Sequence, residues 1–146
     1  MEKRNTIVPA VMLVLKKNNQ ILLLQRKNTG YGDGKYNLIS GHVEFGENFT
    51  NAIIREAKEE ANVTLSHDQV KVIYIQNKMA DDHTHQRVHT YFLATEWEGE
   101  IKNMEAHNCD DLSWFAIDHL PENISPCVKA AIEHIQQGNF YSEFGF

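Results

Sequence analysis

Three glutamates in one short stretch have the types and spacing of metal ligands. Glu56, Glu59 and Glu60 stand at positions i, i+3 and i+4, so on a helix their carboxylates share one face. Like charges at this spacing destabilise a helix by roughly a few tenths of a kcal/mol per pair. A divalent cation would offset this repulsion, and carboxylate ligands suit Mg²⁺ and also Mn²⁺. The stretch therefore indicates a metal site, with Mg²⁺ as the expected cofactor.

A glycine-containing loop and a helix must position these carboxylates. Asn48 is a typical N-cap for the helix, and Asn62 tolerates the left-handed conformation of a C-cap. Four apolar residues fall next to the acidic face rather than opposite it: Phe49, Ile53, Ala57 and Ala61. The carboxylates are therefore predicted at the rim of the core, where partial exclusion of water strengthens metal binding.

The spacing of the whole stretch from Gly41 to Val63 resembles the Nudix box, the signature of hydrolases that cut a nucleoside diphosphate linked to another group. The matching positions are Gly41, Glu47, Arg55, Glu56, Ala57, Glu59, Glu60 and Val63. Asn62 departs from the pattern, because the family usually has glycine there. Asparagine is the next best residue at a left-handed cap, so the turn is expected to survive.

An acidic helix face on its own is more often solvated surface than a metal site. The combination with the loop glycines, Glu47 and Arg55 favours the metal site. The resemblance covers most of the chain and implies the α/β class, as the Nudix α/β/α sandwich with a mixed β-sheet between helices.

The resemblance also implies roles for individual residues. Metal ligands are expected at Ser40, through its backbone carbonyl, and at Glu56, Glu59, Glu60 and Glu105. Glu105 follows a segment similar to a loop of MutT-type Nudix enzymes, in which a glutamate reaches back to the metal; the alternative is an exposed loop acid. Either Glu59 or Glu105 is expected to accept the proton of the attacking water. Arg55 is expected to orient Glu56 or to pair with Glu47.

Other side chains are weaker candidates for contacts with the substrate. Trp114 could stack on a base, although a core position is the commoner place for tryptophan, and Asp110 or Asp111 could read a base edge. The loop histidines His83 and His85, with His89 beyond them, lack the further ligands of a transition-metal site. They are solvated residues or contacts to the substrate. His42 is expected to pack within its loop rather than to bind metal.

Hydrophobic patterns predict the elements around the site. Period-two and buried apolar runs predict strands, a polar stretch predicts a flexible loop at 77–86, and Ser125-Pro126 followed by an apolar stripe predicts a helix that ends at Gly138. The expected strands are 7–15, 21–25, 70–76, 87–95 and 111–117. The aromatic tail 139–146 has two alternatives, folding back on the body or contacting a second copy in a homodimer.

Length and composition indicate one domain, residues 1–146, with an ordinary globular composition. The net charge of −6 provides no basic footprint for duplex nucleic acid. Two cysteines are too few for a disulfide framework, and no apolar run or signal peptide indicates a membrane. The expected location is cytoplasmic.

The expected reaction is Mg²⁺-dependent hydrolysis of a small nucleotide substrate. The favoured substrate is a (deoxy)nucleoside triphosphate with a normal or an oxidised base, cut to the monophosphate and pyrophosphate, because the chain is short and its late loop is MutT-like. The first alternative is an ADP-ribose or nucleotide-sugar pyrophosphatase. The second is a non-catalytic nucleotide-binding regulator, a role that usually accompanies loss of the glutamates that are present here.

Overall fold

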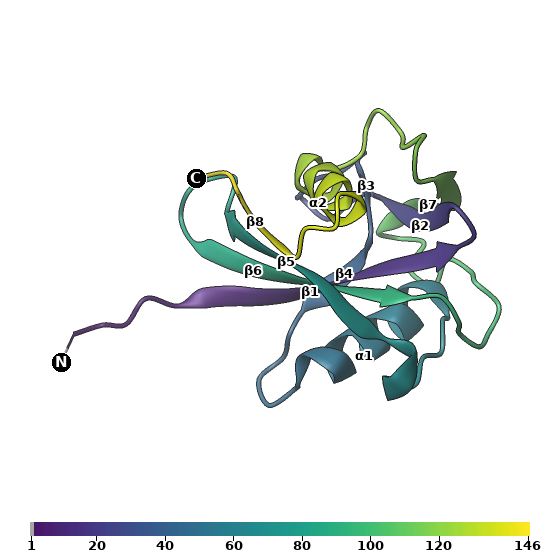
Figure 1. The fold of residues 1–146 in the computed structure, drawn as a ribbon, viewed down its shortest axis with the longest axis horizontal. Helices are drawn as coiled ribbons and strands as arrows, with labels where there is room; N and C mark the ends of the chain where they lie inside the picture. Colours follow the sequence, from purple (N-terminus) through teal and green to yellow (C-terminus); the bar gives the residue numbers. More distant parts are fainter. Residues whose placement is uncertain (1) are drawn as a thin grey trace.

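A mixed sheet with a helix on each face forms the body of the protein, in a computed structural model that describes residues 2–146 (Figure 1). Its strands are β1 (Ile7–Lys17), β2 (Gln20–Arg26), β3 (Tyr36–Asn37), β4 (Ile39–His42), β5 (Lys71–Met79), β6 (Gln86–Ala94), β7 (Cys109–Ala116) and β8 (Tyr141–Phe144). The α-helices are α1 (Phe49–Ala61) and α2 (Pro126–Gln136), and a short 3₁₀ turn covers His67–Gln69.

Strand β1 separates two hydrophobic cores because successive side chains of a strand point to opposite faces. Val11, Leu13 and Leu15 pack in the core that contains α1, whereas Met12 and Val14 pack in the core that contains α2. The helices therefore cover opposite faces of the sheet (Figure 1). The prediction of a mixed sheet between helices is confirmed.

The sheet opens beside β1, and this opening creates room for a cavity. β1 pairs with β2 only next to their turn, at Lys16 with Ile21 and at Lys17 with Gln20. Beyond that point β1 pairs with β4 and, in parallel, with β6, while β2 pairs with β3 and β7. The two strands of the hairpin thus continue into separate groups of strands.

The C-terminal tail folds back on the body as an edge strand. β8 pairs in parallel with β5, with Ile75 opposite Tyr141 and Lys78 opposite Phe144. Phe144 also packs against the core beneath α2. Of the two alternatives for the tail, folding back is therefore the one that this structure shows.

Two details differ from the sequence-based expectation. The predicted loop 77–86 is shorter, because β5 runs to Met79 and β6 begins at Gln86, so only six residues connect the paired strands. Phe49 does not pack beside the other apolar residues of α1. It occupies the first position of the helix and is 38% exposed, whereas Ile53, Ala57 and Ala61 are fully buried.

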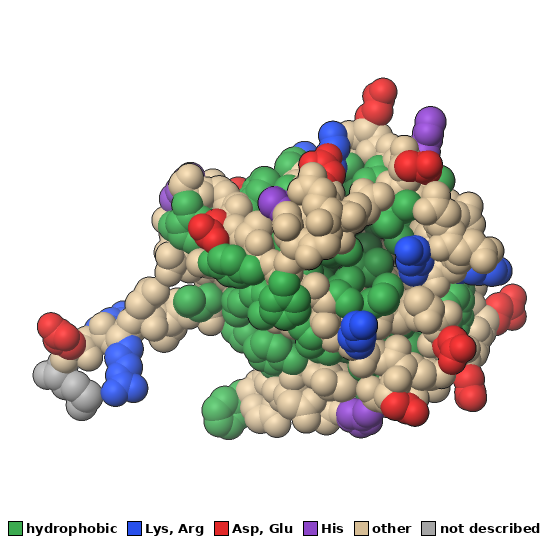
Figure 2. All heavy atoms as spheres, viewed as in Figure 1, with side chains coloured by type: hydrophobic (Ala, Val, Ile, Leu, Met, Phe, Trp, Pro, Cys, Tyr) green, Lys and Arg blue, Asp and Glu red, His purple; other side chains and the backbone are tan. Residues whose placement is uncertain are grey.

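The surface seen in Figure 2 has hydrophobic side chains in its middle and charged side chains of both signs around its rim. This face carries no continuous basic patch of the kind that binds duplex nucleic acid. None of the helices within residues 2–146 has the length and hydrophobicity needed to cross a membrane.

Candidate active site

Helix α1 carries the predicted carboxylates, and its two asparagine caps fix where it begins and ends. The Asn48 side chain accepts a hydrogen bond of 2.7 Å from the backbone amide of Asn51. Asn62 adopts the left-handed conformation, with φ of 60°, and its amide donates to the last carbonyls of the helix. Asparagine therefore fills the position where glycine was expected, as predicted from its tolerance of this conformation.

Strand β4 approaches α1 so closely that position 41 has no room for a side chain. A Cβ atom on Gly41 would collide with the carboxylate of Glu56. Glycine is thus needed here for close approach rather than for an unusual φ angle. The contact places the backbone of β4, including Ser40, directly against the acidic face of α1.

Arg55 holds the acidic face in place from the side. Its guanidinium donates two hydrogen bonds to Glu47, at 2.8 and 3.0 Å, and single bonds to Glu56 at 2.7 Å and Glu59 at 3.3 Å. It also donates to the backbone carbonyl of His42 at 3.1 Å. Arg55 therefore contacts both partners that were expected for it. The hydrogen bonds from Arg55 lower the pKa of Glu47 to about 2.

Glu60 is the most enclosed carboxylate of the group. Burial, followed by the negative charges of Glu56 and Glu105, raises the pKa of Glu60 well above its usual value, and a backbone hydrogen bond from Ser40 partly opposes this shift. Burial also raises the pKa of Glu56, although Arg55 acts in the opposite direction. The site thus concentrates negative charge at a partly buried position, where water screens it less than on the open surface.

The loop after β6 docks on the end of α1 and brings Glu105 to the same place. Backbone amides of Lys102 and Met104 donate to the carbonyls of Ala61 and Glu60 at 3.1 and 3.2 Å. The amide of Glu105 itself donates to the Asn103 side chain at 3.1 Å. These bonds occupy carbonyls that a helix end leaves without partners, and they fix Glu105 within electrostatic range of Glu60.

The donor set at this place fits a hard divalent cation. Its oxygens come from Glu56, Glu60, Glu105 and the backbone near Ser40; burial first, and then the charges of Glu56 and Glu105, raise the pKa of Glu60. Within residues 2–146, no three acidic, histidine or cysteine side chains already stand in an arrangement that would hold a metal by themselves. Glu56 and Glu59 instead accept hydrogen bonds from Arg55. Mg²⁺ suits such a site because it takes few protein carboxylates and completes its shell with water and phosphate.

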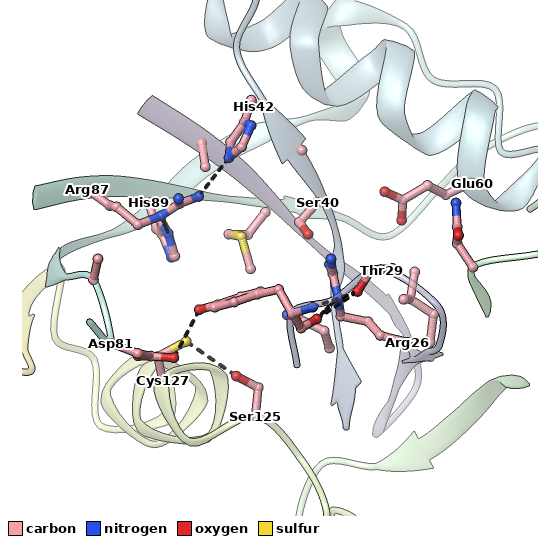
Figure 3. A pocket seen from close by; sticks show the side chains of 18 of the residues that line it. Arg26, Thr29, Ser40, His42, Glu60, Asp81, Arg87, His89, Ser125 and Cys127 are labelled. Carbon is pink, nitrogen blue, oxygen red and sulfur yellow. Dashed lines mark hydrogen bonds between the residues drawn. The ribbon is translucent and has the colours of Figure 1, made fainter. Parts of the chain in front are cut away.

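A cavity of about 680 Å³ lies between the acidic face of α1 and the start of α2 (Figure 3). Its size is that of a typical small-molecule site. Strands from both sides of the sheet opening contribute to its wall, with Met12 from β1 and Leu24 from β2. The polar residues of the wall that matter for the arguments below are Arg26, Tyr31, Ser40, His42, Glu60, Asp81, Asp82, His85, Arg87, His89 and Glu105.

The cavity gathers some of the predicted site residues and not others. Ser40, Glu60 and Glu105 line it, whereas Glu56 and Glu59 lie behind them on α1 and do not. Of the three histidines considered as contacts to the substrate, His85 and His89 line the cavity and His83 does not. His42 lines the cavity as well, and so is more than a loop-packing residue.

Trp114, Asp110 and Asp111, the weaker candidates for contacts with a base, lie outside the cavity wall, and Trp114 takes the core position that was its commoner alternative. Trp114 stacks on Trp97, with ring centroids 5.8 Å apart, and packs against the core beneath α1. Asp110 pairs with Lys27 at 3.2 Å on the surface. Asp111 accepts the hydroxyl of Tyr36 at 2.6 Å, and burial together with this bond raises the pKa of Tyr36 to about 12.

Sequence reasoning missed the basic residues of the cavity. Arg26 ends β2 and lies 5.8 Å from the ring of Tyr31, and Arg87 lies near the start of β6. The signal for Arg87 was present in the predicted strand, because Arg87 and His89 are two residues apart and so share a face. Nothing in the local sequence indicates that this face, which is the one that packs toward α2 further along β6, borders the cavity.

The family model described as NUDIX domain matches residues 6–135, nearly the whole chain. The chain therefore belongs to the Nudix family, which confirms the family expected from the spacing around Arg55. Nudix enzymes act on small nucleotides and generally use a divalent metal.

Curated relatives include the "NAD-capped RNA hydrolase NudC" of Pectobacterium carotovorum, 28% identical over 85% of this chain and 44% of that protein. The protein of the same name from Vibrio cholerae is 29% identical over 79% of this chain and 39% of that protein. The chain thus spans less than half the length of these relatives.

Solved structures support the same fold. A MutT NUDIX hydrolase from Burkholderia pseudomallei has a TM-score of 0.80 at 24% identity, covering 88% of this chain and 98% of the other. A MutT protein from Methanosarcina mazei Go1 has a TM-score of 0.78 at 17% identity, covering 93% and 97%. At these identities the likeness concerns the fold alone.

Proposed function

We propose that the protein is a Mg²⁺-dependent pyrophosphohydrolase that cuts a nucleoside diphosphate linked to another group. The observation that carries this proposal is the burial of Glu60 beside Glu56 and Glu105 at one end of a cavity of nucleotide size. Three acids packed together with little water need a cation, and phosphate oxygens can complete the shell of that cation. The family match supports the same reaction.

Each residue of the site has a specific task in this proposal. When bound, the metal neutralises phosphate charge and lowers the pKa of a water molecule. Glu56 and Glu60, with Glu59 and the Ser40 carbonyl, would hold it. Glu105 would accept the proton of the attacking water; its place in the cavity wall supports it over Glu59, which is half exposed and paired with Arg55. Arg55 positions Glu56 by a 2.7 Å hydrogen bond.

For the substrate we favour a (deoxy)nucleoside triphosphate, cut to the monophosphate and pyrophosphate. The basic residues Arg26 and Arg87 in the cavity wall support a substrate with more negative charge than a simple diphosphate linkage. The names of the curated relatives support a second candidate, a dinucleotide of the NAD type, which also contains a diphosphate bridge. ADP-ribose and nucleotide sugars belong to this second class.

The test is product analysis over a substrate panel with magnesium. The purified protein should release a nucleoside monophosphate from at least one panel member, and Glu60→Gln should lower the rate by about a hundredfold or more, as loss of a group that stabilises charge in the transition state does. Glu96→Gln removes one exposed charge just after β6 and serves as the control with unchanged rate. If the unmodified protein hydrolyses none of the panel members, the non-catalytic nucleotide-binding protein would be the correct alternative.

A further inference from the structure

The wall of the cavity opposite Glu60 carries a second group of polar side chains, formed by Arg87, His89 and His42. Figure 3 shows the three together on one side of the cavity and Glu60 on the other. The Nε atom of Arg87 donates to His89 Nε2 at 3.1 Å, and its Nη2 atom donates to His42 Nε2 at 3.0 Å. We call these three residues the arginine–histidine group.

The hydrogen bonds from Arg87 determine which histidine nitrogen carries the proton. A guanidinium can only donate, so both Nε2 atoms must accept, and each neutral ring then carries its proton on Nδ1. Burial and the nearby charge of Arg87 lower the pKa of His89 to about 3, consistent with a neutral ring. The two neutral rings therefore leave the positive charge of the group on Arg87.

His89 has an unsatisfied donor. Its side chain is only 6% exposed, and among residues 2–146 its Nδ1 atom has no hydrogen-bond partner. An unpaired buried N–H group costs about 1 to 3 kcal/mol. Because this atom has almost no exposed surface, the donor does not open into the cavity, and His89 acts there through its Nε2 atom, which orients Arg87.

The charge of Arg87 is also uncompensated. None of the ion pairs within the described chain involves Arg87, and the acids on the same wall already have partners. Asp81 accepts from Lys78 at 3.0 Å and from the Tyr31 hydroxyl at 3.2 Å. Asp82 accepts from Thr84. The occupant that fits an unpaired cation in the cavity wall is an anionic oxygen group.

We propose that the arginine–histidine group is a specificity subsite that binds a phosphate of the substrate other than the two joined by the bond that is cut. Arg87 would supply the charge and the hydrogen-bond donors, and the two histidines would orient its guanidinium. This inference rests on the proposed function, because it takes the Glu60 end of the cavity as the place of the diphosphate. The extra phosphate is either an extension of the phosphate chain or a phosphate on a ribose.

Calorimetric titration with compounds that the protein cannot hydrolyse tests the two sources separately. With magnesium, α,β-methylene-ATP is compared with α,β-methylene-ADP; without metal, adenosine 2′,5′-bisphosphate is compared with AMP. In one of the two pairs, the compound with the additional phosphate should bind about tenfold tighter or more. This is the gain in affinity that a charge-assisted hydrogen bond usually contributes. The pair that shows this preference identifies the source.

Variants assign the preference to residues. Arg87→Gln and His89→Leu should remove most of the preference and leave the affinity for the compound with fewer phosphates unchanged. His89→Gln can still accept the hydrogen bond from Arg87, so it should retain most of the preference even though its shape differs. Lys71→Gln, which removes an exposed cation at the start of β5 outside the cavity, is the control and should match the unmodified protein.

Two results would overturn the proposal. One is a protein that prefers neither compound with the additional phosphate, and the other is a preference that survives in folded Arg87→Gln. Thermal unfolding of each variant shows whether it is folded. The two proposals can fail separately. If the unmodified protein shows the preference and Arg87→Gln does not, but the unmodified protein hydrolyses no panel member, the proposed hydrolase activity is refuted and the proposed subsite is supported.

Discussion

The missing side chain at position 41 decides where the Glu56 carboxylate can lie. Glu56 occupies the space that a Cβ atom on Gly41 would need, and Arg55 holds it there. A methyl group at position 41 would therefore displace Glu56 on the acidic face of α1 without altering any charge. The effect at this residue is steric and local, so it can be separated from loss of a ligand.

Gly41→Ala should reduce turnover much more than it reduces stability. The new methyl group must displace Glu56, and a shift of about 1 Å in an active site can cost a hundredfold in rate. Gly46→Ala in the loop after β4 is the control for the rate, because nothing lies within 4 Å of the methyl group it would add; its φ of +80° adds backbone strain, which lowers stability only. Initial rates and urea unfolding of both variants provide the measurement. Equal rates for the two variants would contradict the role assigned to Gly41.

The ionisation of Glu47 should make the free energy of unfolding depend on pH between 4.5 and about 2. Its pKa in the folded protein is about 2, below the ordinary value of 4.5. A lowered carboxyl pKa stabilises the folded state fully above 4.5, and this stabilisation is lost as the pH falls toward 2. The free energy of unfolding of Glu47→Gln, measured with urea across this range, should therefore fall less than that of the unmodified protein. Parallel curves would refute the assignment.

Among the elements, the segment from Glu98 to Glu105 links the sheet to the site. Thr64 and Glu98 exchange backbone hydrogen bonds of 2.9 and 3.0 Å, and the Asn62 side chain donates to the Glu100 carbonyl at 2.9 Å. The position of Glu105 thus depends on the hydrogen bonds between this segment and the residues that follow α1. Gly99 permits the approach, with a φ of +96°.

Gly99→Ala should destabilise the fold by about 1 to 3 kcal/mol, because the φ angle is unfavourable for alanine and the Cβ atom would meet the Asn62 carbonyl. Gly138→Ala has a similar φ of +79° but no neighbour within 4 Å, so it isolates the backbone strain, about 1 kcal/mol. Urea unfolding compares the two. If Glu105 is the proton acceptor, Gly99→Ala should also slow hydrolysis, whereas Gly138→Ala should not.

Prediction from sequence worked best for elements whose signals are local. The caps at Asn48 and Asn62 and the spacing of Glu56, Glu59 and Glu60 are properties of one helix, so its bounds and acidic face could be predicted. Trp114 could not be placed in the same way, because its contact is Trp97, seventeen positions earlier in the chain. The arginine–histidine group also needs the hydrogen bond from Arg87 in β6 to His42 in β4, which no pattern within either strand predicts.

At the scale of the whole molecule, the order of the strands brings the two ends of the cavity together. α1 and the loop before β7 supply the acidic end, while β4 and β6, on the two sides of β1, supply the arginine–histidine group. β8 completes this body by pairing with β5. The order of the sheet, rather than any single element, therefore sets the distance that a substrate must span.

Removal of the tail from residue 139 onward should weaken the whole molecule. It exposes the edge of β5 and removes the packing of Phe144, at an expected cost of about 1 to 3 kcal/mol. An uncovered edge can also pair with another chain. Thermal unfolding should show a lower midpoint, and light scattering should show association that grows with concentration. Removal of Phe146 alone, which is 63% exposed, should have little effect on either measurement.

The short pairing between β1 and β2 has a consequence for how a ligand could enter. Because the two strands share only the pairs beside their turn, a small widening of the gap beyond it would break few backbone hydrogen bonds. We therefore expect the gap between β1 and β2 to widen and close transiently. Amide hydrogen exchange should be faster along β4 than along the central part of β6, and a bound nucleotide should slow it.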